Sequence, residues 1–186
     1  MPRITAGEFK GLVLAAPRTL RATGAKVRLA LFNILGDAIV GARVLDGYAG
    51  SGALGFEALS RGAAFVAFVE SDTEAIMAIR DNLEHLGRRL TREEWRLLHL
   101  DIEQGIRQLA EAVPPFDLIF LDPPYRTDEG KKALTAVGGC AILAPDGIVV
   151  VEHHQRTILP SELAPLQRFK QHRYGDTVLS FYQPTR

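Results

Sequence analysis

The stretch Asp122-Pro123-Pro124-Tyr125 has residue types that suit catalysis, and it follows the apolar run Leu118-Ile119-Phe120-Leu121, which predicts a buried strand. Neither proline has an N–H to donate and both fix φ, so the strand must end there. A carboxylate, a rigid backbone and an aromatic ring therefore meet at the carboxyl end of a strand, where ligands bind in open α/β sheets. We predict a catalytic site built from all four residues. The competing interpretation is a rigid turn with Tyr125 packed in the core.

A glycine-rich loop, Gly50-x-Gly52-x-x-Gly55, lies between a predicted strand that ends at Asp46 and a predicted helix over 53–60. The glycines permit a tight turn and let a cofactor approach the backbone. Glu70 follows about 20 residues later, where a carboxylate can accept hydrogen bonds from ribose hydroxyls. The spacing formally matches the dinucleotide fingerprint, so an NAD-dependent oxidoreductase is one interpretation. A tight turn without a ligand is another.

Strands alternate with helices from residue 43 onward, which predicts an α/β fold with a mostly parallel sheet and helices on both faces. A closing antiparallel hairpin over 168–174 and 177–182 gives seven strands in all. Ser71 and Glu74 form a predicted capping box at the start of one helix. The five parallel strands each end on an acid, which favours a polar cleft at one edge of the sheet. These acids are Asp46, Glu70, Asp101, Asp122 and Glu152.

Composition favours a cytoplasmic protein with one main domain. The chain has 186 residues, 47% of them hydrophobic, and a single cysteine, Cys140, which indicates a reducing compartment. We expect no leader peptide and no membrane span, since no apolar run is long enough. The five histidines lack metal-ligand spacing with each other or with Cys140, so no metal is expected.

The first forty residues have a different character and are predicted to form a β-hairpin over 4–15 and a helix over 26–35. Residues 1–43 hold seven Lys and Arg against Glu8 and Asp37, a net charge of +5, and the rest of the neutral chain carries −5. This asymmetry favours a polyanionic partner, although a solvated basic surface is the alternative. We divide the chain into a basic N-terminal extension, 1–40, and a catalytic domain, 41–186.

Two motifs carry a resemblance to a known class. Asp46-Gly47-Tyr48-Ala49-Gly50-Ser51-Gly52 resembles the S-adenosylmethionine loop of Rossmann-like methyltransferases, and Asp122-Pro123-Pro124-Tyr125 resembles the motif of those that methylate exocyclic or amide nitrogens. Matching stretches along the chain extend the similarity to the bacterial 16S rRNA guanine-N2 methyltransferases of the small ribosomal subunit. They are Arg3-Ile4-x-x-Gly7-x-x-Lys10-Gly11, the run from Arg21 to Leu35, Ala49-Gly-Ser-Gly-Ala-Leu-Gly55, Glu57-Ala-Leu-Ser-Arg-Gly-Ala63 and Tyr174-Gly-Asp-Thr177.

This resemblance implies a monomer that uses S-adenosylmethionine to methylate the N2 amine of one guanine in 16S rRNA, on the small subunit or a late assembly intermediate. The Asp122 carboxylate and the Pro123 carbonyl would accept hydrogen bonds from the amine, and Tyr125 would offer a ring face to the base. The cofactor residues would be Asp46, Tyr48, Ala49, Gly50, Ser51, Gly52, Glu70, Ser71, Asp101, Ile102 and Asp122. The RNA-binding residues would be Arg3, Lys10, Arg18, Arg21, Lys26 and Arg28.

The chain departs from the family pattern at Gly47-Tyr48, where Leu-Phe is usual, and at Leu29, where an acid is common. Gly47 is expected to loosen the loop, and the Tyr48 hydroxyl requires a partner. Three alternative functions stay open at this point. They are an N6-adenine methyltransferase acting on DNA or RNA, an NAD-dependent oxidoreductase and a catalytically silent RNA-binding assembly factor.

Overall fold

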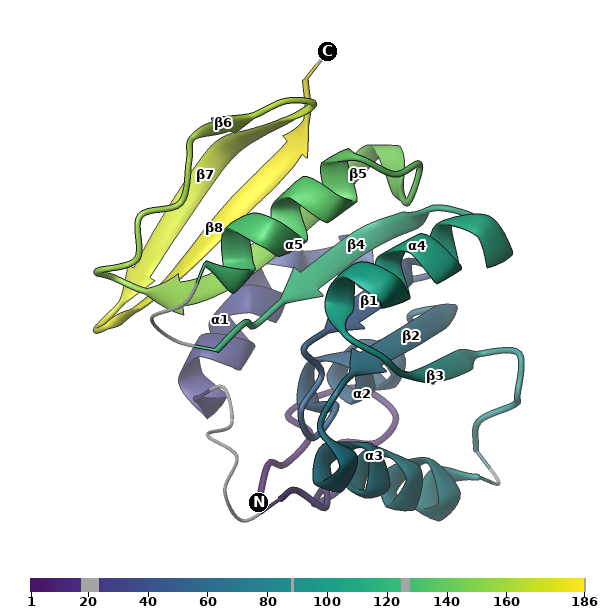
Figure 1. Ribbon diagram of the computed structural model, residues 1–186. Helices are drawn as coiled ribbons and strands as arrows, with labels where there is room; N and C mark the ends of the chain where they lie inside the picture. Colours follow the sequence, from purple (N-terminus) through teal and green to yellow (C-terminus); the bar gives the residue numbers. More distant parts are fainter. Residues whose placement is uncertain (18–23, 88, 125–127, 186) are drawn as a thin grey trace.

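The computed structural model describes residues 1–17, 24–87, 89–124 and 128–185 (Figure 1). The predicted Rossmann-like α/β fold is confirmed: one sheet in the order β3-β2-β1-β4-β5-β8-β7-β6 lies between helices. The strands are β1 (Arg43–Gly47), β2 (Phe65–Glu70), β3 (Trp95–His99), β4 (Phe116–Leu121), β5 (Leu143–His154), β6 (Glu162–Leu163), β7 (Leu166–Tyr174) and β8 (Thr177–Pro184). The helices are α1 (Ala25–Leu35), η1 (Gly36–Ile39), α2 (Ala53–Ser60), α3 (Thr73–Leu86), α4 (Ile102–Ala112) and α5 (Glu129–Gly138).

Strands β3, β2, β1, β4 and β5 are mutually parallel, and β8, β7 and β6 continue the sheet in antiparallel fashion. The predicted hairpin is therefore present as β7 and β8. Seven strands were expected, and the eighth is β6, a two-residue strand that pairs with β7. The fifth strand is also longer than predicted, so Glu152 lies within β5 and the strand ends two residues later at His154.

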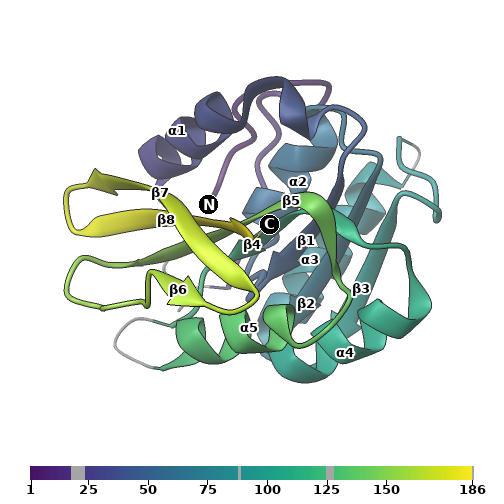
Figure 2. The same cartoon turned by 90° about the horizontal axis from the view of Figure 1, so that it is seen from above.

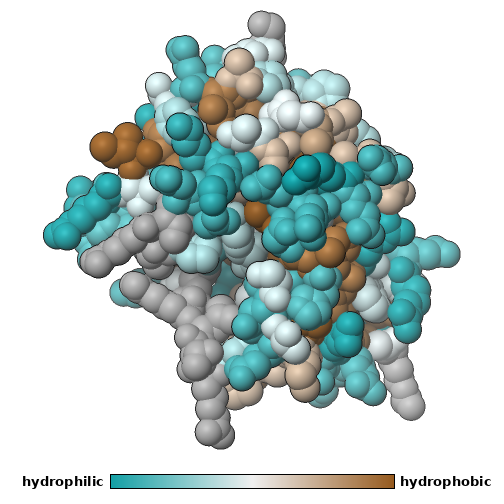
Figure 3. Space-filling view, viewed as in Figure 1, coloured by the Kyte–Doolittle hydropathy of each residue, from teal (hydrophilic) through white to brown (hydrophobic). Residues whose placement is uncertain are grey.

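Strict alternation along the strands separates two apolar cores. In β2, Val66 and Phe68 face one core while Ala67 and Val69 face the other. Helices α1, α2 and α3 contribute to the first core, and α4 and α5 to the second, on the opposite face (Figure 2). The face that carries α4 and α5 is mostly hydrophilic at its surface (Figure 3). None of the helices in the described ranges is long and apolar enough to cross a membrane.

The predicted N-terminal hairpin is only partly right. Residues 1–15 contain no regular strand among those that the structure describes, but a single antiparallel bridge joins Arg3 and Val13. The segment instead joins the first core through Ile4, Phe9 and Leu14, all of which are buried. Packing against the larger core therefore fixes this segment, rather than a β-ladder.

Candidate active site

The glycine loop is wound tightly between β1 and α2. Tyr48, Gly50 and Gly52 all have positive φ, of 57°, 56° and 74°, and the Gly52 amide donates to the Ala49 carbonyl over 2.7 Å. Glycine tolerates this backbone region freely, whereas a tyrosine there is uncommon. The loop therefore places a strained Tyr48 at the end of β1, a feature often found at functional sites.

Gly47 does not loosen the loop, contrary to expectation. It is the last residue of β1, and a Cβ there would lie 2.7 Å from Ile102 Cδ1 and 2.9 Å from Leu121 Cδ2. The Tyr48 hydroxyl finds its partner in Glu129, donating to the side-chain oxygen over 3.1 Å. Burial and the nearby Glu129 carboxylate raise the pKa of Tyr48, so the phenol stays protonated as a donor. This bond joins the loop to the first turn of α5.

Glu70 ties the end of β2 to the loop. One carboxylate oxygen accepts from the Gly50 amide over 2.8 Å, and the other accepts from the amides of Ser71 and Asp72 over 2.7 and 2.8 Å. Three backbone donors thus hold this carboxylate in one orientation. The predicted capping box is wrong, because Ser71 is exposed and does not cap α3. Asp72 caps that helix instead, by accepting from the Ala75 amide.

Asp101 is the N-cap of α4, where it accepts from the Gln104 amide over 2.9 Å. The next residue, Ile102, is buried, and its side chain approaches Gly47. Both residues lie beyond the end of β3, at the same edge of the sheet as Glu70.

Asp46 is 1% exposed and accepts from the Gly55 amide over 2.8 Å, so it braces the first turn of α2. Burial raises the pKa of the Asp46 carboxyl well above its ordinary value of 3.8, and the charges of Asp122 and Glu70 raise it further, while the Gly55 hydrogen bond opposes the shift. The three carboxyl groups therefore share one electrostatic environment.

The raised pKa of Asp46 predicts a specific pH dependence. The folded chain binds this proton more tightly than the unfolded chain, so stability falls as pH rises from about 4 through the folded-state pKa, by up to about 1.4 kcal/mol per pH unit. Asp46→Asn keeps an acceptor for Gly55 without the charge, and it should remove this loss. Urea unfolding between about pH 4 and pH 8 should show that the free energy of unfolding of the variant, relative to that of the wild type, increases as pH rises. Asp37→Asn, on the surface, is the charge-removal control, and parallel wild-type and Asp46→Asn curves would contradict the prediction.

The Asp-Pro-Pro stretch leaves the sheet beside this loop. Strands β1 and β4 are neighbours in register, with Gly47 opposite Leu121, and the Asp122 amide lies 3.4 Å from the Gly47 carbonyl oxygen. Asp122 is half-buried, and Pro123 is buried while Pro124 is exposed. Tyr125, the fourth predicted catalytic residue, lies outside the described residues.

The predicted basic surface is only partly formed as expected. Arg3, Lys10 and Lys26 are exposed, with Arg3 Nη1 donating to the Gly11 carbonyl over 2.9 Å. Arg28 is 2% exposed: its Nη2 donates to the Arg3 carbonyl over 2.7 Å, and its Nε lies 3.6 Å from Glu57. The guanidinium is thus committed to an internal ion pair and is not presented to a polyanion. Arg18 and Arg21 lie outside the described residues.

Comparison with known proteins settles the family. A family model described as conserved hypothetical protein 95 matches residues 2–183. The chain belongs to this family. It is 36% identical over 183 residues to YlbH of Bacillus subtilis, which covers 97% of this chain and 98% of the relative. It is also 32% identical over 183 residues to the ribosomal RNA small subunit methyltransferase D of Escherichia coli, covering 97% and 89% of the two chains.

A solved structure of the Escherichia coli protein yhhF is similar along the whole chain, with a TM-score of 0.84 and 31% identity over 99% of this chain and 98% of the other. The predicted resemblance to small-subunit rRNA methyltransferases is therefore confirmed at the level of the family, as is the methyltransferase fold. Among the described residues of this family member, no group of three or more His, Cys, Asp or Glu side chains is placed to hold a metal ion.

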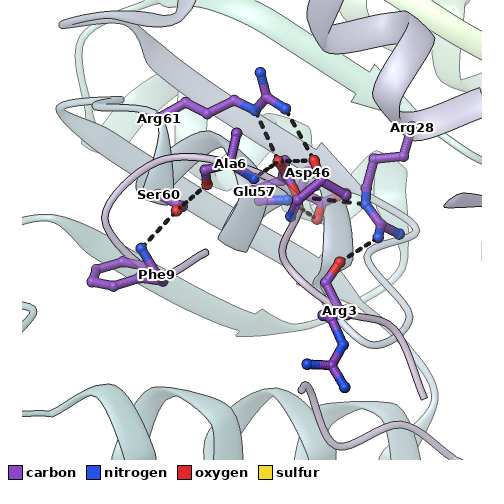
Figure 4. Close-up of polar contacts among 10 residues, drawn as sticks. Arg3, Ala6, Phe9, Arg28, Asp46, Glu57, Ser60 and Arg61 are labelled. Atoms are coloured by element: carbon purple, nitrogen blue, oxygen red, sulfur yellow. Dashed lines mark hydrogen bonds and ion pairs between the residues drawn. The ribbon is translucent and has the colours of Figure 1, made fainter. Parts of the chain in front are cut away.

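Buried polar side chains of α2 and α3 hold residues 1–15 of this family member in place, and the sequence did not single out two of them individually. Glu57 of α2 is fully buried and accepts from the Thr5 and Ala6 amides over 2.9 and 3.2 Å, and from Arg61 Nε over 2.8 Å (Figure 4). Its sequence signals were its place in the matching stretch Glu57–Ala63 and its i,i+4 spacing with Arg61.

The second residue is Asn82 of α3, which is 5% exposed. Its side chain accepts from the Ala15 amide over 2.8 Å and donates to the Ala15 carbonyl over 3.0 Å. The same Nδ2 reaches the carbonyl of Ser51, in the glycine loop, over 3.4 Å. Asn82 thus contacts the N-terminal segment and the loop at once, which no local pattern in α3 could indicate.

Proposed function

We propose that this chain is an S-adenosylmethionine-dependent methyltransferase that acts on the N2 amine of a guanine in the 16S rRNA of the small ribosomal subunit. The observation that carries the proposal is that Asp122-Pro123-Pro124 leaves β4 directly beside the glycine loop that ends β1. The relative from Escherichia coli, a ribosomal RNA small subunit methyltransferase, supports the substrate class. Such a substrate would place the reaction in the cytoplasm.

The residues at this edge of the sheet fit S-adenosylmethionine by their chemistry. Its ribose hydroxyls, ammonium and adenine amine are hydrogen-bond donors, and the sheet edge offers the carboxylates of Glu70, Asp101 and Asp122. Glu70 would hold the ribose and Asp101 the adenine, while Asp46 orients the loop through Gly55. The remaining cofactor contacts that we propose come from Tyr48, Ala49, Gly50, Ser51, Gly52, Ser71 and Ile102.

A pyrophosphate fits this loop poorly, which argues against the NAD alternative. Anions bind a helix N-terminus through its open amides, but here Gly55 already donates to Asp46 and Gly50 already donates to Glu70. Two carboxyl groups therefore already accept from amides at this loop, and the charge of Glu70 would repel a pyrophosphate. We favour a cofactor that is cationic near its reacting centre.

The proposed reaction needs orientation more than a strong base. A guanine amine is a weak nucleophile because its lone pair is delocalised into the ring. Acceptors at the Asp122 carboxylate and the Pro123 carbonyl would hold its N–H groups and favour loss of planarity as the nitrogen gains a methyl group. The nitrogen would release one proton to solvent by way of the Asp122 carboxylate. Bound S-adenosylmethionine supplies an already activated methyl group. Two consecutive prolines fix the acceptors beforehand, and we propose that Tyr125 stacks on the base.

The RNA surface that we propose begins with Arg3, Lys10 and Lys26, which are exposed, together with Arg18 and Arg21. Arg28 contributes indirectly, since it fixes the backbone of Arg3. Residues 1–40 would thus serve as the RNA-contacting extension of a catalytic domain, 41–186, in a protein that acts as a monomer. Phosphate contacts of this kind position the substrate without reading its sequence.

The decisive experiment incubates the protein and labelled S-adenosylmethionine with small subunits from a strain that lacks the endogenous enzyme, followed by nucleoside analysis. We expect N2-methylguanine as the labelled product. Labelled N6-methyladenine would instead support the adenine methyltransferase alternative. Binding of the RNA without any transfer would support the silent assembly factor and contradict the proposal.

A further inference from the structure

Strand β7 carries an unusual set of side chains for an outer strand. Its nine residues, Leu166 to Tyr174, include Arg168, Lys170 and Arg173 and contain no acid. Phe169 is 45% exposed, although aromatic residues of this size are mostly buried. The term β7 strip here means Phe169, Lys170, His172 and Tyr174.

The register of the sheet places this strip on one face. Lys170 pairs with Phe181, His172 with Leu179 and Tyr174 with Thr177, and directly paired residues share a face of an antiparallel sheet. A bulge between Arg168 and Lys170 turns the Phe169 ring toward the same face, 6.3 Å from the Phe181 ring.

Contacts between aromatic rings hold the side chains of the strip against β8. The His172 ring lies 5.9 Å from Phe181 in an edge-on arrangement and 6.4 Å from Tyr174 in a stacked one. His172 Nε2 is shielded from solvent and has no hydrogen-bond partner in the part of the chain that the structure describes. The ring of His172 is thus held in place by its neighbours, and its Nε2 can still make one hydrogen bond.

The strip leads toward the active-site edge. Tyr174 ends β7 at the turn whose Asp176 carbonyl accepts from the Gln155 amide over 2.8 Å, just beyond the carboxyl end of β5. One side of β7 pairs with β8 along its length. On its other side, β7 pairs with β6 at Leu166 and Gln167 only. From Phe169 to Tyr174 the strand extends over about 17 Å at the usual rise of an extended chain. Strand β7 lies near one end of the sheet (Figure 2).

Charges on an outer strand can simply block pairing with another chain, and this accounts for Lys170 and Arg173. It does not account for an exposed phenylalanine, which makes an outer strand more prone to association. Rings beside one cation, Lys170, and without acids suit a single-stranded nucleic acid, whose bases stack on aromatic faces and whose phosphates pair with cations. Arg168 and Arg173 pair with Tyr182 and Val178 and so lie on the other face of the strand. Because the strip has no acid, a polyanion suits it better as a partner than a protein surface that carries both acidic and basic side chains.

We propose that the β7 strip binds a single-stranded segment of the RNA substrate next to the methylated base, with a base stacked on Phe169 and a phosphate beside Lys170. This inference rests on the proposed function and extends it, because the contact lies on the opposite end of the chain from the basic N-terminal extension. It gives the RNA a second point of attachment besides the basic N-terminal extension.

The test compares methyl transfer to unmethylated small subunits by the wild type and by Phe169→Leu, Phe169→Trp and Lys170→Gln. Leucine keeps the packing on Phe181 but cannot stack, so we expect KM for the subunit to rise about 5-fold or more with little change in kcat. Tryptophan should retain the wild-type KM. Lys170→Gln should lower the salt dependence of RNA binding by about one unit of slope. Met77→Ala and Arg80→Gln, on α3, are matched controls for an exposed apolar and an exposed basic side chain.

The outcomes separate the inference from the proposed function. Wild-type activity with KM values for Phe169→Leu and Lys170→Gln that equal the controls would overturn the inference alone. An inactive wild type that still binds S-adenosylmethionine would overturn both. Placing p-benzoylphenylalanine at position 169 and irradiating the complex should yield an RNA adduct. An adduct to ribosomal protein only would show that the strip contacts protein and would also overturn the inference.

Discussion

Asp122→Ala is expected to lower kcat by about 10²- to 10³-fold, the loss typical of removing one preorganised electrostatic contact to a transition state. The proposed role of this carboxylate is to hold the amine as its nitrogen loses planarity, a contact that strengthens only as the bond forms. Affinity for S-adenosylmethionine should change by a modest factor. Single-turnover transfer to unmethylated small subunits and equilibrium cofactor binding, measured side by side, check both statements.

Asp128→Ala is the matched control, since Asp128 is an exposed acid at the start of α5 whose side chain makes no capping bond. It should leave turnover near the wild-type value. Unchanged turnover in Asp122→Ala would contradict the role proposed for Asp122. A fall in rate that full saturation with cofactor restores would instead assign Asp122 to cofactor binding.

Glu57→Ala is expected to cost about 3–5 kcal/mol in the free energy of unfolding, out of a total of about 5–15 kcal/mol for a domain. The substitution leaves the Arg28 guanidinium, 2% exposed, without its counter-charge. It also removes the acceptor for the amides of Thr5 and Ala6 (Figure 4). Urea unfolding at neutral pH measures the loss, and limited proteolysis should cut residues 1–15 first.

The ion pair between Arg107 and Glu103 serves as a surface control for the buried pair. Its atoms lie 3.4 Å apart, and the two side chains are 63% and 46% exposed. Glu103→Ala should cost no more than about 1 kcal/mol, because solvent screens a surface pair. The double variant Arg28→Met with Glu57→Leu should recover part of the loss, since an apolar pair needs no counter-charge. Equal costs for Glu57→Ala and Glu103→Ala would contradict the burial argument.

The parallel half of the sheet could be predicted because its signals are local and repeated. Strand β4 is buried on both faces and so appears as one apolar run, and its end is fixed by Pro123 and Pro124. Strand β6 was missed because two residues between prolines carry no periodicity. The N-terminal segment was predicted as a hairpin because its glycines resemble turn residues, whereas Gly7 is needed for close contact: a Cβ there would lie 1.7 Å from the Ser60 carbonyl oxygen.

The acids of the candidate site were predicted for a related reason, since each lies at the carboxyl end of a strand or just beyond it. Their partners were not predictable, because the Gly50 amide on Glu70 and the Gly55 amide on Asp46 are tertiary contacts. Arg28 shows the limit most clearly. A basic residue in a basic segment suggests a phosphate contact, but its position on the inner face of α1, opposite Glu57, depends on how α1 packs against α2.

The side chain of Asn82 has a mechanical consequence for substrate binding. It pairs with both polar groups of the Ala15 backbone, as an adjacent strand would, while also bonding Ser51. As long as these bonds persist, Ala15 and the glycine loop keep a fixed separation. If RNA binding moves the basic residues of the extension, that movement must leave Ala15 in place, so it would not displace the glycine loop.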